Sequence, residues 1–274
     1  MKNPKNLYQI GSLQEPTMEK DSFSSLLVLS IMGFSISASN LMLNPIISVY
    51  ARDYAGATMA EVGIIVSAFS IISMFSSPMI GFYVGVRKIF LMPILGLFLM
   101  VISPLGMAFV STPLSLAFFR LIQGLGNAMI WAPCMTLVIL ISSDARRNEN
   151  IGRYTTVTSL GMTIGPTIGT LGNSILGIRN TFLLASVMAL VGFLYSSKLI
   201  QRKNSLLSYN NGVPESKPRF SSSSLREILS NKTIKITFTA YLAVCYVYNI
   251  LVAYGTIYAK DTLKIGENYI PSCL

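Results

Sequence analysis

The run Leu114–Ser142 reads LSLAFFRLIQGLGNAMIWAPCMTLVILIS and contains one charged side chain, Arg120, in 29 residues. About 20 apolar residues in a helix cross the ~30 Å hydrocarbon core of a bilayer. Lipid offers the backbone no hydrogen-bond partner, so a run of this length must be a helix. Placing an arginine there costs about 2.5–3.5 kcal/mol on insertion scales, so its side chain should face protein or water. The run therefore predicts a membrane helix with a polar interior face.

Six further runs of the same kind surround this one, and the composition agrees with them. Hydrophobic residues make up 52% of the 274-residue chain, charged residues 12%, and the mean hydropathy is +0.58. A soluble domain carries about 25% charged residues. Strands of a membrane barrel would alternate apolar and polar residues, and these runs do not. We predict an all-α membrane protein with spans at Ser24–Ala51, Val62–Val84, Ile89–Val110, Leu114–Ser142, Tyr154–Leu176, Phe182–Leu199 and Ile236–Tyr258.

Lysine and arginine residues are distributed unevenly between the two sides of these predicted helices. With the N-terminus inside, 16 of the 21 fall on the inner side, four on the outer side, and Arg120 within a span. This is the positive-inside bias of membrane proteins. The net charge of +10 therefore indicates topology, and we expect a lipid bilayer and no nucleic acid as partner. We expect a multi-pass protein of the cell membrane with a cytoplasmic N-terminus and an external C-terminus.

A polar linker divides the chain into unequal parts. The first helix ends Tyr50-Ala51-Arg52-Asp53 and the seventh ends Tyr258-Ala259-Lys260-Asp261, 208 residues later. Matching ends in two helices of the same direction are typical of parallel repeats, so the seventh helix is expected to restart the fold. We predict a cytoplasmic N-terminal tail (1–23), a six-helix bundle (24–199), a cytoplasmic linker (200–235), a seventh membrane helix (236–258) and an external tail (259–274).

Two motifs resemble those of the major facilitator superfamily of transporters. Arg120-Leu-Ile-Gln123-Gly124-Leu-Gly126-Asn127-Ala128 matches the RxxQGxGxA motif of that family's fourth helix at every fixed position. Gly161-Met-Thr-Ile-Gly165-Pro166-Thr-Ile-Gly169 is similar to the GxxxGPxxG motif of its fifth helix, which is commonest in antiporters and drug exporters. The resemblance implies a six-helix N-terminal bundle followed by the first helix of a second bundle, truncated relative to a twelve-helix transporter.

A third motif resembles that family less completely. Gly81-Phe-Tyr-Val-Gly85-Val-Arg87-Lys88 keeps the leading glycine and the basic pair of the family's loop between helices two and three. It lacks the aspartate of that loop and is about two residues short. Gly81, Arg87 and Lys88, with the fifth-helix residues Gly161, Gly165, Pro166 and Gly169, form the predicted conformational motif.

Candidate substrate-path residues lie on the first and fourth helices. Ser37, Asn40, Asn44 and Ser48 recur at three- and four-residue steps and so share one helix face. This face either lines a cavity or forms hydrogen bonds between helices, which contribute about 0.6 kcal/mol each. Arg120 either faces the interior or extends to the outer headgroups. The polar residues that follow it favour the interior. The predicted substrate-path residues are Ser37, Asn40, Asn44, Arg120, Gln123 and Asn127.

The three glycines of the fifth helix are spaced by four, which predicts a groove for close helix packing. Pro166 lacks a backbone donor and should bend this helix. In the resembled family, the segment packs against the eighth helix across the two halves.

Enzyme chemistry is not indicated by the sequence. The chain has no histidine, its three cysteines lack metal spacing, and no phosphate-binding loop or nucleophile elbow is present, so we expect no cofactor or metal. All eleven acidic residues lie outside the predicted spans, so no proton site is expected there. We predict a secondary transporter of a small solute, exporting a hydrophobic or weakly polar compound. The alternative is a membrane module without transport activity, which self-associates or pairs with a complementary half.

Overall fold

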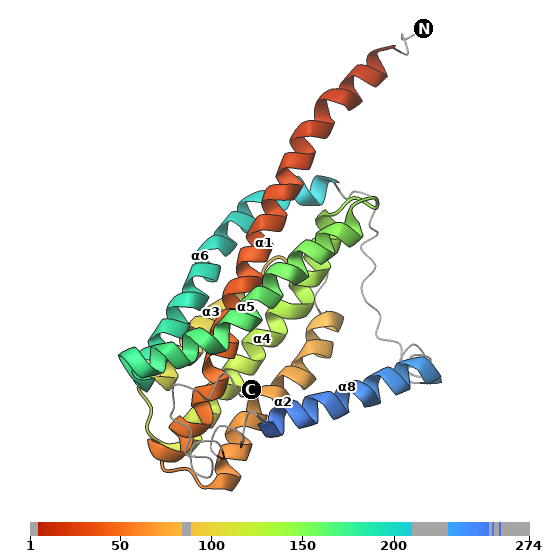
Figure 1. The fold of residues 1–274 in the computed structure, drawn as a ribbon. Coiled ribbons are helices and arrows are strands. Elements are labelled where there is room, and N and C mark those ends of the chain that lie inside the picture. The colour runs from red at the N-terminus through yellow and green to blue at the C-terminus, as the bar shows by residue number, and fades with distance from the viewer. Residues whose placement is uncertain (1–4, 84–88, 210–229, 252–253, 255–257, 259–274) are drawn as a thin grey trace.

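The computed structural model describes residues 5–83, 89–209, 230–251, 254 and 258, with side chains for residues 23–81, 89–199 and part of 230–258. Within these residues all regular secondary structure is helical (Figure 1). The all-α class is therefore confirmed. The helices are α1 (Lys5–Asp53), α2 (Met59–Tyr83), α3 (Met92–Met107), α4 (Pro113–Ile141), α5 (Arg147–Leu176), α6 (Ile178–Tyr209) and α8 (Lys232–Ile250).

Local sequence signals fix several helix ends. Thr112 caps α4, accepting a hydrogen bond from the Ser115 amide, and Pro113 occupies the first turn, where its missing N–H is harmless. α2 begins with a capping box, in which Glu61 accepts hydrogen bonds from the amide and hydroxyl of Thr58, both at 2.8 Å. α5 ends at Gly177, whose φ of +82° is strained for any other residue.

Three helices extend beyond the predicted spans. α1 begins at Lys5, α5 at Arg147, and α6 continues to Tyr209, inside the predicted linker. These additions are polar, so hydropathy does not detect them, although they can form helix in water. The predicted seventh span corresponds to α8. Residues 210–229 of the linker, residues 252–253 and 255–257 of that span, and the tail 259–274 lie outside the described residues.

By length and composition, four of the described helices could cross a membrane: Phe23–Asp53, Met59–Gly81, Pro113–Ile141 and Ile178–Leu199. α3 is apolar but shorter, and α5 is more polar than the others. Several α5 hydroxyls bond to their own helix, as Thr163 does to the Ser159 carbonyl and Thr170 to the Pro166 carbonyl, both at 3.0 Å. Bonds of this kind satisfy hydroxyl groups that would otherwise be costly in lipid.

The six helices α1–α6 pack side by side, and the start of α1 projects beyond them (Figure 1). α1 packs chiefly against α5 and α6, and α4 against α2 and α3. α8 runs obliquely to the bundle, and Tyr254, just beyond its end, donates a hydrogen bond to the Met59 carbonyl at the start of α2 (3.5 Å). The described α8 side chains are exposed, so the bundle α1–α6 forms its core without this helix.

The partner of the α5 glycine groove differs from the one implied by the family resemblance. A methyl group at Gly161 would lie 2.6 Å from the Phe34 carbonyl oxygen, and one at Gly165 would lie 2.8 Å from that of Ala38. A methyl group at Gly169 would approach α1 more closely still. The groove is therefore filled by α1 of the same bundle, because glycine lets the two backbones touch. A helix of this bundle therefore packs on the glycines, where the resemblance implied the eighth helix of the second half.

Candidate functional site

A polar layer separates two apolar clusters inside the bundle. One cluster contains Met42 of α1 and Leu116 of α4, toward the end predicted to be external. The other contains Ile36 of α1 and Ile130 of α4, toward the end predicted to be cytoplasmic. Between the two clusters, α1 carries Asn40, and α4 carries Arg120, Gln123 and Asn127. The layer therefore lies near the middle of α4 and of the apolar part of α1, Phe23–Asp53.

Arg120 lies inside the bundle, not among the headgroups, since 2% of its surface is exposed. Its Nη1 atom donates a hydrogen bond to Oε1 of Gln123 over 2.9 Å, one turn further along α4. Its guanidinium carbon lies 5.8 Å from the centre of the Phe69 ring of α2, within the range of a cation–π contact. An aromatic face and an amide oxygen therefore offset part of the cost of burying this charge.

Gln123 connects α4 to α1. Its side chain is fully buried, and its Nε2 atom donates a hydrogen bond to Oδ1 of Asn40 over 3.2 Å. Asn40 itself is half-buried. Arg120, Gln123 and Asn40 thus form a continuous hydrogen-bonded chain across two helices.

Asn127 connects α4 to α2. Its Nδ2 atom donates to the Ser73 hydroxyl over 3.1 Å, and its own Oδ1 is buried with no hydrogen-bond partner in the described part of the chain. Sequence reasoning missed both Ser73 and Phe69 as members of this site. The signal for Ser73 was present, since α2 carries a serine at every third position in Ser67, Ser70, Ser73 and Ser76.

The remaining α1 candidates occupy different surroundings. Ser37 is 3% exposed and packs against α5, where a methyl group at Gly161 would lie 3.2 Å from its Cβ. Its hydroxyl oxygen has no hydrogen-bond partner among the described residues. Ser48 is fully buried, whereas Asn44 is half-buried like Asn40. The polar face of α1 is therefore divided, with its serines in helix packing and its asparagines partly accessible.

The residues of the predicted conformational motif that the structure describes lie in different surroundings. Gly81 is exposed near the end of α2, and a methyl group added there would meet nothing within 4 Å. Arg87 and Lys88 lie outside the described residues. The α5 glycines are buried against α1, and α5 runs through Pro166 without interruption. Their observed role is helix packing.

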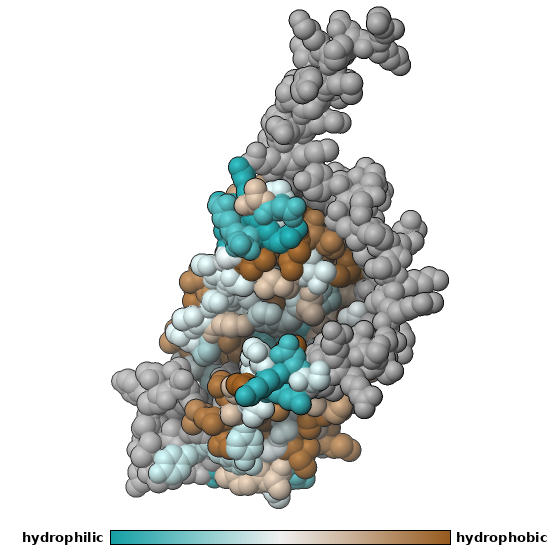
Figure 2. All heavy atoms as spheres, turned by 90° about the vertical axis from the view of Figure 1, so that its right-hand side faces the viewer, coloured by the Kyte–Doolittle hydropathy of each residue, from teal (hydrophilic) through white to brown (hydrophobic). Residues whose placement is uncertain are grey.

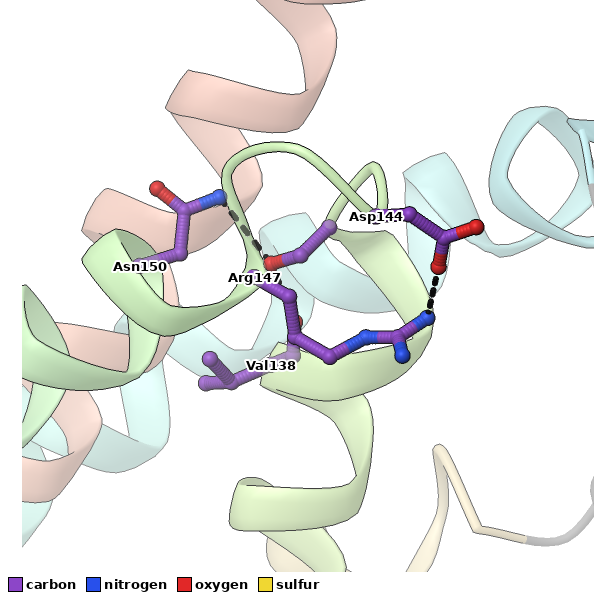
Figure 3. Close-up of polar contacts among 5 residues, drawn as sticks. Val138, Asp144, Arg147 and Asn150 are labelled. Atoms are coloured by element: carbon purple, nitrogen blue, oxygen red, sulfur yellow. Dashed lines mark hydrogen bonds and ion pairs between the residues drawn. The ribbon is translucent and has the colours of Figure 1, made fainter.

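The connection between α4 and α5 has a polar network of its own (Figure 3). Ser142 donates to the Val138 carbonyl over 2.6 Å and accepts from Nδ2 of Asn150 over 3.0 Å. Arg147 and Asp144 form an ion pair in the same turn. These contacts join the end of α4 to the first turns of α5. Figure 2 shows hydrophilic residues gathered at the end of the bundle, beside an apolar flank.

The described residues contain no group of three His, Cys, Asp or Glu side chains able to hold a metal ion. Cys134 is buried and forms no disulfide in the described part of the chain. The chemistry that this interior offers is therefore hydrogen bonding and one buried cation, arranged at mid-depth in a bundle of apolar helices. Such a fold and site define a polytopic helical membrane protein of the transporter type.

Comparison with known families gives the particular class. The family model of the Major Facilitator Superfamily matches residues 29–273, so the chain belongs to this family. The multidrug resistance protein MdtG of Salmonella arizonae is 25% identical over 200 residues, covering 71% of this chain and 47% of the relative. The uncharacterized MFS-type transporter MJ1560 of Methanocaldococcus jannaschii is 26% identical over 249 residues, covering 86% of this chain and 63% of the relative.

Solved structures support the same fold. A bacterial homolog of the human lysosomal transporter Spinster, in an inward-facing and unoccupied conformation, matches with a TM-score of 0.61 and 14% identity over 92% of this chain and 58% of that one. A POT family transporter in complex with a thioalcohol-conjugated peptide matches with a TM-score of 0.59 and 18% identity over 85% and 50%. The chain spans about half the length of the MdtG relatives that it matches.

Proposed function

We propose that this chain supplies one bundle of a secondary transporter that moves a small solute by alternating access. The observation that carries the proposal is the polar layer of Asn40, Arg120, Gln123 and Asn127 between two apolar clusters. Polar groups at this depth are costly in lipid and are retained where they contact a solute or water. Transporters of this family hold solute at mid-depth and rock two bundles around it.

Export of a hydrophobic or weakly polar compound is the direction and substrate class we propose. The buried clusters on either side of the four polar residues are apolar, so a solute with one polar group would fit better than a highly charged one. The name of the MdtG relatives, multidrug resistance protein, supports a compound of this kind. No acidic residue of the chain lies in the apolar part of a described span, so a coupling proton would bind elsewhere in the working transporter.

A second candidate is a membrane module that does not transport solute by itself and pairs with another chain. It is favoured by the fold, since α1–α6 form one bundle and alternating access needs two bundles that face each other. The two candidates differ in whether the chain as given moves solute, and the final prediction of the Discussion tests that difference.

Solute binding tests the proposed path directly. The chain has one tryptophan, Trp131, which is half-buried one turn along α4 from Asn127 and can report on the polar layer. In lipid nanodiscs, a neutral ketone such as dicyclohexyl ketone should change its fluorescence in a saturable way. Asn127→Leu should weaken this binding, whereas Asn180→Leu on the exposed start of α6 should not. A linear, unsaturable response to the ketone would contradict the proposed path.

Direction is tested separately, with intact cells. The test uses cells that lack their own drug pumps and produce a fusion, in which this bundle is joined by its linker to the second bundle of an MdtG relative. We expect these cells to accumulate less dye than the same cells without the fusion. The same fusion carrying Arg120→Ala should restore accumulation. Equal accumulation with both fusions would argue against export through this bundle.

A further inference from the structure

The hydrogen-bonded chain from Arg120 to Asn40 has a fixed direction. An arginine guanidinium only donates hydrogen bonds, so the atom of Gln123 that faces Arg120 must be its carbonyl oxygen. The Nε2 atom of Gln123 then points the other way, where it donates to Asn40. The orientation of the Gln123 amide is therefore set by chemistry at Arg120 and does not depend on which end of the amide was assigned as oxygen.

The same logic continues to Asn40. Because Gln123 presents a donor, Asn40 must turn its Oδ1 atom toward α4. Its Nδ2 atom, with two N–H groups, then points away from Gln123. In the part of the chain that the structure describes, no other hydrogen bond of Asn40 is formed, and the side chain is half-buried. A polar hydrogen left without a partner at this depth costs about 1–3 kcal/mol, so a solute that can accept it gains by binding there.

We propose that Arg120 and Gln123 are positioning residues that make Asn40 a hydrogen-bond donor toward the solute path. The site then selects solutes that carry an acceptor, such as a ketone, ester, ether or amide carbonyl, over solutes that can only donate. This inference rests on the proposed function, and it adds the polarity of the group that the transporter recognises. It also gives Arg120 a role at a distance, without contact to the solute.

A purely structural role would leave this polarity without effect. If the chain of hydrogen bonds served only to hold α4 against α1, its alteration would change stability and weaken all ligands alike. A change in preference between two ligands of the same size therefore separates the two interpretations. Dicyclohexyl ketone can only accept a hydrogen bond, and dicyclohexylmethanol can both accept and donate one, so the pair differs mainly in that property.

Gln123→Glu is the sharpest variant. A glutamate keeps the size of glutamine and still accepts a hydrogen bond from Arg120, but it has no N–H to donate. Asn40 must then turn its Nδ2 atom toward Glu and its Oδ1 atom toward the solute path. The alcohol can still bind by donating to that oxygen, whereas the ketone would face an oxygen and lose its partner.

The measurement is the dissociation constant of the ketone divided by that of the alcohol. Both constants are obtained from Trp131 fluorescence in nanodiscs. In the unaltered chain, the two probes should bind within about threefold of each other, since Asn40 donates to either oxygen. In Gln123→Glu, the ketone should bind about tenfold more weakly relative to the alcohol, which corresponds to one neutral hydrogen bond. Asn40→Asp should also weaken ketone binding relative to alcohol binding, because it presents a carboxylate oxygen to the solute path while Gln123 stays intact.

Asn40→Asp keeps the inference testable if Gln123→Glu does not fold. A matched control tests whether the added charge alone changes the ratio. Asn180→Asp makes the same chemical change at an exposed position of α6, where Asn180 donates to the Leu176 carbonyl, and should leave the ratio unchanged. An unchanged ratio in folded Gln123→Glu or folded Asn40→Asp would overturn this inference and leave the proposed path intact. Failure of both probes to bind the unaltered chain would overturn the path and this inference together.

Discussion

Arg120 is the buried end of the chain of hydrogen bonds that joins α4 to α1, and its neighbours depend on it. The guanidinium satisfies Oε1 of a fully buried Gln123, and it lies beside the Phe69 ring. A charge so placed is held by several weak partners, which act together because each fixes the orientation of the next.

The first prediction concerns removal of this side chain. Arg120→Ala should destabilise the bundle by about 1–3 kcal/mol, because Gln123 Oε1 is left buried without a donor. Arg120→Lys should recover part of the stability and part of the ketone binding, since an ammonium group still donates to Gln123 but cannot reproduce the planar guanidinium. Thermal unfolding in detergent and ketone titration of Trp131 fluorescence would measure these two effects.

The control for this prediction is Arg153, which forms a 2.6 Å ion pair with Glu149 on the surface of α5. Both side chains are about half exposed, at 49% and 53%. Exposed pairs contribute at most about 1 kcal/mol, so Arg153→Ala should change little. Equal losses of stability from Arg120→Ala and Arg153→Ala would show that Arg120 is not held as described.

At the residue scale, the sequence indicated the polar members of the site but not all of their partners. Arg120 was identifiable because a charge in an apolar run is costly. Gln123 and Asn127 followed because the motif and helical spacing placed them near it. Ser73 and Phe69 were missed, since a serine or a phenylalanine in a membrane helix is common and its partner depends on how helices pack. Which of two helix faces meets which neighbour is not encoded in the spacing within one helix.

At the element scale, the packing of α5 against α1 depends on three glycines whose added methyl groups would meet backbone. The obstacles are carbonyl oxygens of Phe34 and Ala38, and for Gly169 that of Met42. Backbone of a buried helix cannot move aside as the tip of a flexible side chain can. Overpacking of this kind commonly costs about 1–3 kcal/mol.

The second prediction follows from this contact. Gly169→Ala should lower the unfolding temperature most, and Gly161→Ala and Gly165→Ala should lower it less, because their added methyl groups would lie farther from α1. Gly152→Ala, also on α5, is the matched control, since its methyl group would meet nothing within 4 Å. Alanine there should be neutral or stabilising by up to about 1 kcal/mol through helix propensity. A Gly169→Ala protein as stable as Gly152→Ala would contradict the close packing of α5 on α1.

The helix bounds show what hydropathy can and cannot predict. α4 was expected at Leu114–Ser142 and is found at Pro113–Ile141, because its apolar run and its Thr112 cap coincide. α5 was expected from Tyr154 but begins earlier, at Arg147, and the added residues include the ion pair of Glu149 with Arg153. The charged first turns of α5 gain stability from ion pairs such as that of Arg153 with Glu149, which apolar length does not measure. The partner of the α5 groove was mispredicted for another reason: the glycine spacing indicates a close neighbour but not its identity.

At the scale of the whole molecule, the third prediction is the side of the membrane on which each helix end lies. This prediction follows from the distribution of lysine and arginine residues. A fluorescent protein fused after Leu199 should be fluorescent in the cytoplasm, and alkaline phosphatase fused at Leu274 should be active outside. Phosphatase inserted in the α1–α2 connection near Gly56, where φ is +68°, should also be active. Finding the Leu199 and Leu274 fusions on the same side would remove one crossing from the proposed topology.

The fourth prediction concerns the contact between α2 and the segment that follows α8. The Tyr254 hydroxyl lies against Met59, and a methyl group at Gly63 would lie 2.8 Å from the same hydroxyl. A cysteine pair at Met59 and Tyr254 should therefore form a crosslink with a short bifunctional reagent in membranes. A pair at Gly81 and Tyr254 should not form this crosslink, because Gly81 lies at the end of α2 opposite to Met59. Crosslinking of both pairs at similar rates would show that α8 has no fixed place beside α2.

The last prediction is that the chain as given inserts into membranes but does not transport solute when it is present alone. Alternating access requires two bundles that face each other across the solute, and α1–α6 supply one. Asn40 is half-buried in this bundle, so part of the polar layer remains accessible. Lipid at that surface would leave the Nδ2 atom of Asn40 without an acceptor, and polar groups between helices promote association in membranes.

We therefore expect self-association in mild detergent, reduced by Asn40→Leu and unchanged by Asn180→Leu. The α5 glycines should not contribute to this association, because α1 already fills their groove. Sedimentation in matched-density detergent would give the oligomeric state. Vesicles containing the chain alone should show no saturable flux of dicyclohexyl ketone. Saturable flux that is lost in Arg120→Ala would contradict this prediction, and it would show that two copies of one bundle can enclose a solute between them.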